Sequence, residues 1–119
     1  MPSVNKREDG THGENLAVDY LKKKGYRILE RNFRFERGEI DIIAEQHDTL
    51  IFIEVKARRS TSFGTPEDAV TSTKQRQIQK VAEGYLFINS VDGKACRFDV
   101  IAIQFENGTP NIRHYENAF

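Results

Sequence analysis

Cysteine is almost absent from this chain, because Cys96 is the single one among 119 residues. One cysteine cannot form a disulfide within the chain, and it cannot build a zinc site from several thiolates. Proteins without disulfides are typical of reducing compartments, so we predict a cytoplasmic location.

Long apolar runs are also missing. No segment approaches the ~20 consecutive apolar residues that a membrane-crossing helix needs. Residues 1–13 are polar and contain no apolar stretch of the kind found in signal peptides. We therefore expect neither a membrane partner nor an export signal.

An excess of charge of one sign is lacking as well, since 18 basic residues balance 18 acidic ones. Strongly basic domains often bind nucleic acid, so the overall charge gives no support for that partner, which must be argued from local arrangement. The content of 38% hydrophobic and 30% charged residues is typical of a globular domain rather than a disordered chain.

The hydrophobic pattern predicts a flexible N-terminal arm at residues 1–12 and a single domain at residues 13–119. The expected elements are a helix at 13–24, an irregular β-rich segment at 26–35, strands at 39–44 and 50–56, a helix at 74–88, a strand at 97–103 and a short last strand at 111–115. A helical connection between strands favours a parallel return to the same sheet. The expected fold class is therefore α/β, with a mixed β-sheet flanked by helices in the order αβββαβ and a short last strand.

The strands at 39–44 and 50–56 are expected to form a hairpin, because only a short polar segment joins them. A loop of two residues (His47-Asp48) or of four (46–49) places Asp41 directly opposite Glu54, whereas a slip of one residue would put them on opposite faces. Opposed β-carbons lie ~4.5–5.5 Å apart. Two carboxylates at that distance repel each other unless a cation lies between them, and Mg²⁺ or Mn²⁺ would suit oxygen ligands of this kind.

Lys56 lies two residues after Glu54 and therefore shares its face of the strand. Its ammonium group could position or activate a water molecule, or neutralise charge that develops on a phosphate. Phosphodiester hydrolysis needs a metal ion, a water nucleophile and a cation for the transition state. We therefore predict that Asp41, Glu54 and Lys56 are catalytic and that Asp41 and Glu54 hold the metal.

Asp41, followed after twelve residues by Glu54-Val55-Lys56, resembles the PD-(D/E)xK nuclease superfamily. The chain is still more similar to the YraN-type uncharacterised protein family. This likeness is carried by Gly13-Glu14 with Ala17, residues 38–44, residues 52–56, Phe63-Gly64 and residues 97–100. The superfamily's proline before the first acid is absent, because Ile40 stands there.

The resemblance implies a restriction-endonuclease-like core and a Mg²⁺- or Mn²⁺-dependent endonuclease that acts on DNA, with structured or branched DNA as one substrate class. It also implies a homodimer if the enzyme cuts junctions, because two symmetric cuts need two sites. The alternative is a nucleic-acid-binding module of the same fold that does not cleave or that needs a partner. A third reading makes the acid cluster purely structural.

Glu14 has two interpretations. Thr11 and Glu14 match a capping box at the start of the first helix. Glu14 also matches the additional acid of archaeal Holliday-junction resolvases, and this resemblance makes it a third metal ligand. One residue could serve both roles.

Basic residues near the end of the 50–56 strand form a candidate nucleic-acid-binding edge, because α/β sheets usually bind ligands at the carboxyl ends of strands. These residues are Arg58, Arg59, Lys74, Arg76 and Lys80. A solvated helix face is the competing interpretation.

Other polar residues are expected to be structural. Glu39 is predicted to pair with Lys56 across the hairpin, and Asp99 with Arg97 along one strand face. Cys96 is expected in the core. The histidines lack metal-ligand spacing and are expected at the surface; they are His12, His47 and His114.

Overall fold

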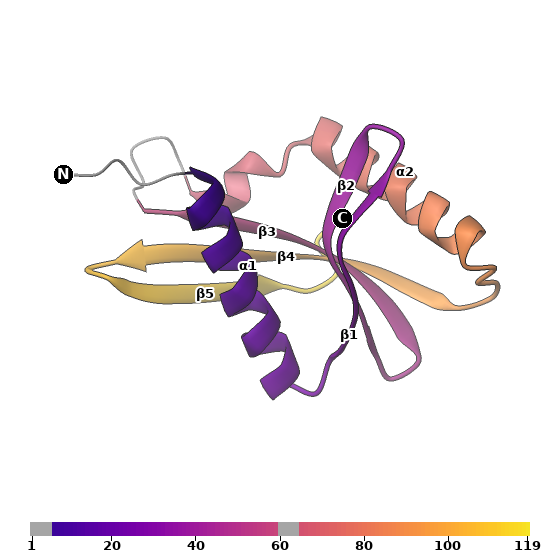
Figure 1. Ribbon diagram of the computed structural model, residues 1–119, viewed down its shortest axis with the longest axis horizontal. Coiled ribbons are helices and arrows are strands. Elements are labelled where there is room, and N and C mark those ends of the chain that lie inside the picture. Colours follow the sequence, from indigo (N-terminus) through magenta and orange to yellow (C-terminus); the bar gives the residue numbers. More distant parts are fainter. Residues whose placement is uncertain (1–5, 60–64) are drawn as a thin grey trace.

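The computed structural model describes residues 6–59 and 65–119 (Figure 1). Its elements are α1 (Lys6–Lys23), β1 (Arg27–Phe35), β2 (Gly38–Gln46), β3 (Thr49–Arg58), the 3-10 helix η1 (Pro66–Ala69), α2 (Ser72–Ile88), β4 (Ala95–Glu106) and β5 (Thr109–Tyr115). The strands form one sheet in the order β1-β2-β3-β4-β5. The predicted mixed α/β order is confirmed, including the parallel pairing of β4 with β3 after α2.

Two apolar cores cover the two faces of the sheet. On one face, Ala17, Val18 and Leu21 of α1 pack against Ile42 of β2 and Ile53 of β3, among others. The second core lies under α2 and contains Ile40, Ile43, Leu50, Phe52, Ile78, Val81, Ala82 and Tyr85. Because β3 is covered on both faces, its run of apolar residues is that of a central strand.

The β2–β3 hairpin has the predicted two-residue turn. His47 and Asp48 have φ angles of 51° and 60°, and Gln46 pairs with Thr49. Positive φ at both central residues is the mark of a type I′ turn, which matches the twist of the strands it joins. The register then runs to the pair Ile42–Ile53.

The first helix differs from the expectation. It begins at Lys6, so residues 6–12, predicted as part of a flexible arm, are helical. The capping-box interpretation of Thr11 and Glu14 was wrong, because both residues lie inside the helix rather than at its start. The helix ends at Lys23, one residue before the predicted end at residue 24. Gly25 follows with a φ of 88°, and the amide of Tyr26 donates to the carbonyl of Leu21.

Three smaller outcomes complete the comparison. The segment expected to be irregular is a strand, β1, with one register shift between Ile28 and Glu30. The Phe63-Gly64 segment and residues 1–5 lie outside the described residues. Over the described parts of the chain, neither helix has the length and apolar character needed to span a bilayer.

Candidate functional site

Asp41 and Glu54 lie where β2 and β3 separate. The pairing of these strands stops at Ile42–Ile53, one step before Asp41 and Glu54 would face each other. At that point an Oδ atom of Asp41 accepts a hydrogen bond of 2.8 Å from the backbone amide of Val55. The Glu54 side chain is only 3% exposed. Asp41 and Glu54 therefore lie together just beyond the paired part of the hairpin, where a side-chain hydrogen bond links them.

The charges in this cluster disfavour ionisation. Burial, a hydrogen bond with Glu54 and the charge of Glu54 raise the pKa of Asp41 to about 8, while the Val55 amide and Lys56 pull it down. A pKa of about 8 keeps the proton on Asp41 at neutral pH in the metal-free protein. A divalent cation would compete with that proton for the oxygens of the two acids.

Glu14 reaches the same cluster from the other face of the sheet. Burial and the charge of Asp41 raise the pKa of Glu14, opposed by hydrogen bonds from Asn32 and Arg31. A nitrogen of Arg31 lies 3.5 Å from its Oε1. Glu14 is thus coupled to Asp41 and neutralised in part by Arg31.

Glu54 provides the observation that tests whether a cation fits. Its Oε2 is buried and has no hydrogen-bond partner, although buried carboxylate oxygens are normally bonded. Mg²⁺ is often held by one or two carboxylates, with water and substrate phosphates completing its shell. Asp41 and Glu54 fit that donor set. Within residues 6–59 and 65–119, no three His, Cys, Asp or Glu side chains are grouped to hold a metal ion, so Glu14 does not complete a three-ligand set.

Two lysines, Lys56 and Lys74, act on the acid pair, whereas the sequence predicted only Lys56. The charge of Lys56 acts on Asp41 from the adjacent strand. The Nζ atom of Lys74, on α2, lies 3.3 Å from Oε2 of Glu54. The sequence placed Lys74 on a surface edge, whereas the structure brings it into the acid cluster.

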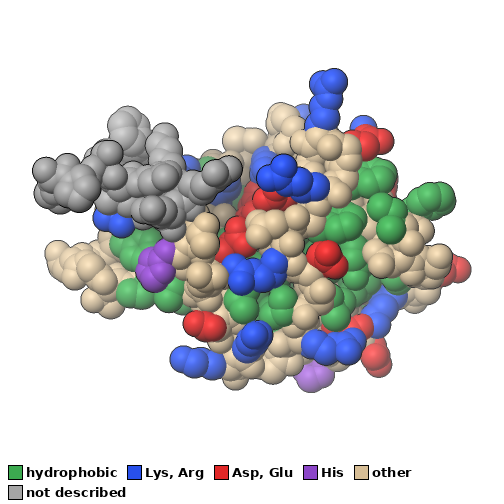
Figure 2. Space-filling model, viewed as in Figure 1, with side chains coloured by type: hydrophobic (Ala, Val, Ile, Leu, Met, Phe, Trp, Pro, Cys, Tyr) green, Lys and Arg blue, Asp and Glu red, His purple; other side chains and the backbone are tan. Residues whose placement is uncertain are grey.

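The other basic candidates remain outside this cluster. Arg58 and Arg59 are exposed at the end of β3. Arg76 is exposed and bonds the Thr73 hydroxyl, and Lys80 pairs with Glu36 at 3.5 Å. Figure 2 shows acidic side chains near the middle of one face with Lys and Arg side chains beside them.

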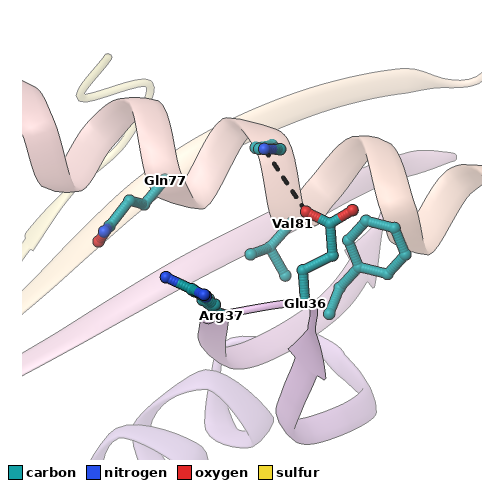
Figure 3. Close-up of a pocket in the computed structure, with 7 residues that line it drawn as sticks. Glu36, Arg37, Gln77 and Val81 are labelled. Carbon is teal, nitrogen blue, oxygen red and sulfur yellow. Dashed lines mark ion pairs between the residues drawn. The ribbon is translucent and has the colours of Figure 1, made fainter.

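A pocket lies next to this region, between α2 and the turn that joins β1 to β2 (Figure 3). Its volume is about 630 Å³ and it is lined by Phe35, Glu36, Arg37, Gly38, Gln77, Lys80 and Val81. The catalytic candidates are not among these residues. Glu36 and Arg37 lie at its side in the close-up, and Glu36 pairs with Lys80 at 3.5 Å. The pocket is therefore polar at its rim and does not replace the acid cluster as the candidate site.

Glu39 lies outside the cluster, and the prediction that it pairs with Lys56 was wrong. It pairs with Arg34 of β1 at 2.8 Å, because β1 flanks β2 on the side away from Lys56. Cys96 was also predicted wrongly, since it is exposed.

A second polar cluster surrounds Asp99. The predicted pair with Arg97 is present, with hydrogen bonds of 2.9 and 2.8 Å. Asp99 also contacts His114 at 2.7 Å and accepts a bond from the amide of Asn117. The prediction of a surface position for His114 was wrong, because its side chain is 4% exposed. Burial would raise the pKa of Asp99, but bonds from His114 and Arg97 outweigh it and lower that pKa.

Comparison with known proteins places the chain among close relatives. Residues 13–103 match a family described as uncharacterised protein family UPF0102. A UPF0102 protein of Alkaliphilus oremlandii is 52% identical over 112 residues, covering 92% of this chain and 96% of the relative. One of Caldicellulosiruptor saccharolyticus is 48% identical over 120 residues, covering 98% and 100%, respectively.

Proposed function

We propose that this chain, which belongs to the uncharacterised protein family UPF0102, is a metal-dependent endonuclease that hydrolyses phosphodiester bonds in DNA. Structured or branched DNA is the substrate class to test first. We also propose that its mixed sheet is a restriction-endonuclease-like core, with the active site at the opening between β2 and β3. A homodimer would supply the two sites that symmetric cleavage of a junction requires.

The observation that carries the proposal is the acid pair itself. Like charges on neighbouring strands destabilise a sheet, and here both carboxylates are also withdrawn from water. Oε2 of Glu54 is buried without a hydrogen bond, and its ion-pair partner among the described residues is Lys74. A structural role would favour a neutral or oppositely charged partner at one of these positions, whereas a cation-binding role explains the pair.

Each residue then has a distinct task. Asp41 and Glu54 would hold Mg²⁺ or Mn²⁺, which when bound supplies a Lewis acid for the phosphoryl group and lowers the pKa of water. Lys56 would orient the attacking water or stabilise negative charge on the phosphate. Glu14 adds negative charge behind Asp41 and so strengthens the attraction for a cation.

A non-cleaving nucleic-acid-binding module is the second candidate. It is favoured by the lack of a three-donor metal group in the described residues. It predicts salt-dependent binding to nucleic acid without cleavage in any metal.

A cleavage panel separates the two candidates. Labelled duplex, single-stranded and four-way-junction DNA are incubated with the protein in Mg²⁺, in Mn²⁺ and in EDTA. We expect cleavage only with a divalent ion, and a loss of about 100-fold or more in Asp41→Ala, Glu54→Gln and Lys56→Ala. Glu39→Gln is the matched control. Glu39 is an acid of β2, like Asp41, but it pairs with Arg34 outside the cluster.

Cleavage that survives Asp41→Ala or Lys56→Ala would overturn the site assignment. Binding without cleavage of any substrate in either metal would favour the second candidate.

A further inference from the structure

Lys74 makes a contact that the proposed mechanism does not use. Its Nζ atom lies 3.3 Å from Oε2 of Glu54, the oxygen that has no hydrogen bond. Within the described ranges, no other cation lies within ion-pair distance of Glu54. Among the described residues, Lys74 is therefore the cation that neutralises this buried carboxylate in the metal-free protein.

Lys74 lies at a position in α2 that is unfavourable for a lysine. Thr71 caps the helix and its hydroxyl accepts a bond of 3.2 Å from the Lys74 amide, so Lys74 lies in the first turn. The first turn of a helix is its positive end and favours acidic residues rather than lysine. Glu54 compensates for this unfavourable placement, because its Oε2 atom lies 3.3 Å from the ammonium group.

Lys74 and a divalent cation would compete for the same oxygen. A metal ion held by Glu54 would lie close to the ammonium group, and cations at such distances repel strongly where water is scarce. The Lys74 side chain is 32% exposed, so it has room to move outward on its flexible stem. Once displaced from Glu54, the ammonium group of Lys74 would lie at the edge of the site, in a position to contact an anionic substrate.

We propose that Lys74 is a second lysine of the site with two alternating partners. In the metal-free protein it neutralises Glu54, and with metal bound it contacts a phosphate of the nucleic acid. This inference rests on the proposed function above. It makes Lys74 a substrate-positioning residue that the metal sets free.

The proposal predicts opposite effects of one substitution on two ligands. Lys74→Met removes the competing charge but keeps the length of the side chain. Mn²⁺ should therefore bind about threefold to tenfold more tightly, because the acid pair loses its resident cation. Nucleic acid should bind about fivefold or more weakly, because a phosphate contact is lost.

Metal affinity is measured by calorimetric titration of Mn²⁺ into the full chain, without DNA and at a pH above the raised pKa of Asp41. Lys80→Met is the matched control, since Lys80 lies on the same helix and pairs with an exposed glutamate outside the cluster. Its Mn²⁺ affinity should equal that of the wild type. Lys74→Arg, which keeps the charge, should not bind Mn²⁺ more tightly.

Nucleic-acid affinity is measured by fluorescence anisotropy with a labelled four-way junction in Ca²⁺. Lys23→Met, at the far end of α1, is the control for loss of one positive charge. If Lys74→Met is poorly folded by circular dichroism, Lys74→Gln provides the same test.

The outcomes separate this inference from the proposed function. A wild type that binds no Mn²⁺ would overturn both. A wild type that binds Mn²⁺, with a Lys74 variant that binds it equally or more weakly, would overturn the inference alone. Unchanged binding of the junction by Lys74→Met would also overturn it.

Discussion

The pKa of Asp41 is strongly raised, first by burial and then by the neighbouring acid Glu54. Burial and Glu54 raise its pKa to about 8, and the charge of Asp41 in turn raises the pKa of Glu14. An acid whose pKa is higher in the folded than in the unfolded state binds its proton more tightly when folded. Its contribution to stability is therefore greatest when it is protonated and declines as pH rises from its usual value of 3.8 towards 8.

We predict that Asp41→Asn removes much of this pH dependence. In EDTA, the wild type should lose stability between mildly acidic and mildly alkaline pH, while the variant should change less, because it has no carboxylate to ionise beside Glu54. At the alkaline end the variant should be more stable by about 1 kcal/mol or more. Urea denaturation at a series of pH values measures this, with Glu39→Gln as the control. Parallel pH profiles for wild type and Asp41→Asn would contradict the account.

Sequence reasoning at the residue scale succeeded where contacts are local. The Arg97–Asp99 pair follows from two residues on one strand face. His114 and Lys74 could not be assigned in this way, because their acid partners come from other elements. Asp99 meets His114 across the β4–β5 hairpin, and Glu54 meets Lys74 across the sheet–helix contact. The unfavourable position of Lys74 in the first turn was the one available signal.

At the scale of elements, the β2–β3 hairpin was predictable because side chains alternate with a period of two. A two-residue turn at His47-Asp48 therefore sets the register as far as the pair Ile42–Ile53, and Asp41 and Glu54 are the next residues along each strand. The start of α1 was not predictable in the same way. Residues 6–12 have no apolar periodicity, which is the signal by which helices are recognised in a sequence.

Two helical glycines should respond oppositely to alanine. Gly84 lies in α2 beneath the Phe35 ring, and a Cβ there would lie 2.4 Å from ring atoms. Gly10 in α1 has nothing within 4 Å of that position. Gly10→Ala should stabilise the protein by about 0.5–1 kcal/mol, because alanine favours helix. Gly84→Ala should destabilise it by about 1–3 kcal/mol through overpacking.

Thermal denaturation of both glycine variants measures the difference. Stabilisation by Gly84→Ala would show that the β1–β2 turn is not pressed against α2. That contact matters for the site, because the same turn leads into β2 and Asp41.

At the scale of the whole molecule, the candidate site draws on every layer of the fold. Glu14 comes from the helix on one face, Lys74 from the helix on the other, and Asp41, Glu54 and Lys56 from the sheet between them. The central position of β3 is what allows both helices to reach one cluster. Topology and register were predictable from the sequence, but this convergence was not, since it depends on how each helix crosses the sheet.

The central claim is that Asp41 and Glu54 form a divalent-cation site. The most direct test is a titration of ¹⁵N-labelled protein with Mg²⁺, followed by NMR of the backbone amides. The account predicts that the signals of Asp41, Glu54 and Val55 shift in a saturable way, and that Glu54→Gln weakens or abolishes the shifts. Signals that stay unmoved at a pH above the raised pKa of Asp41 would contradict it.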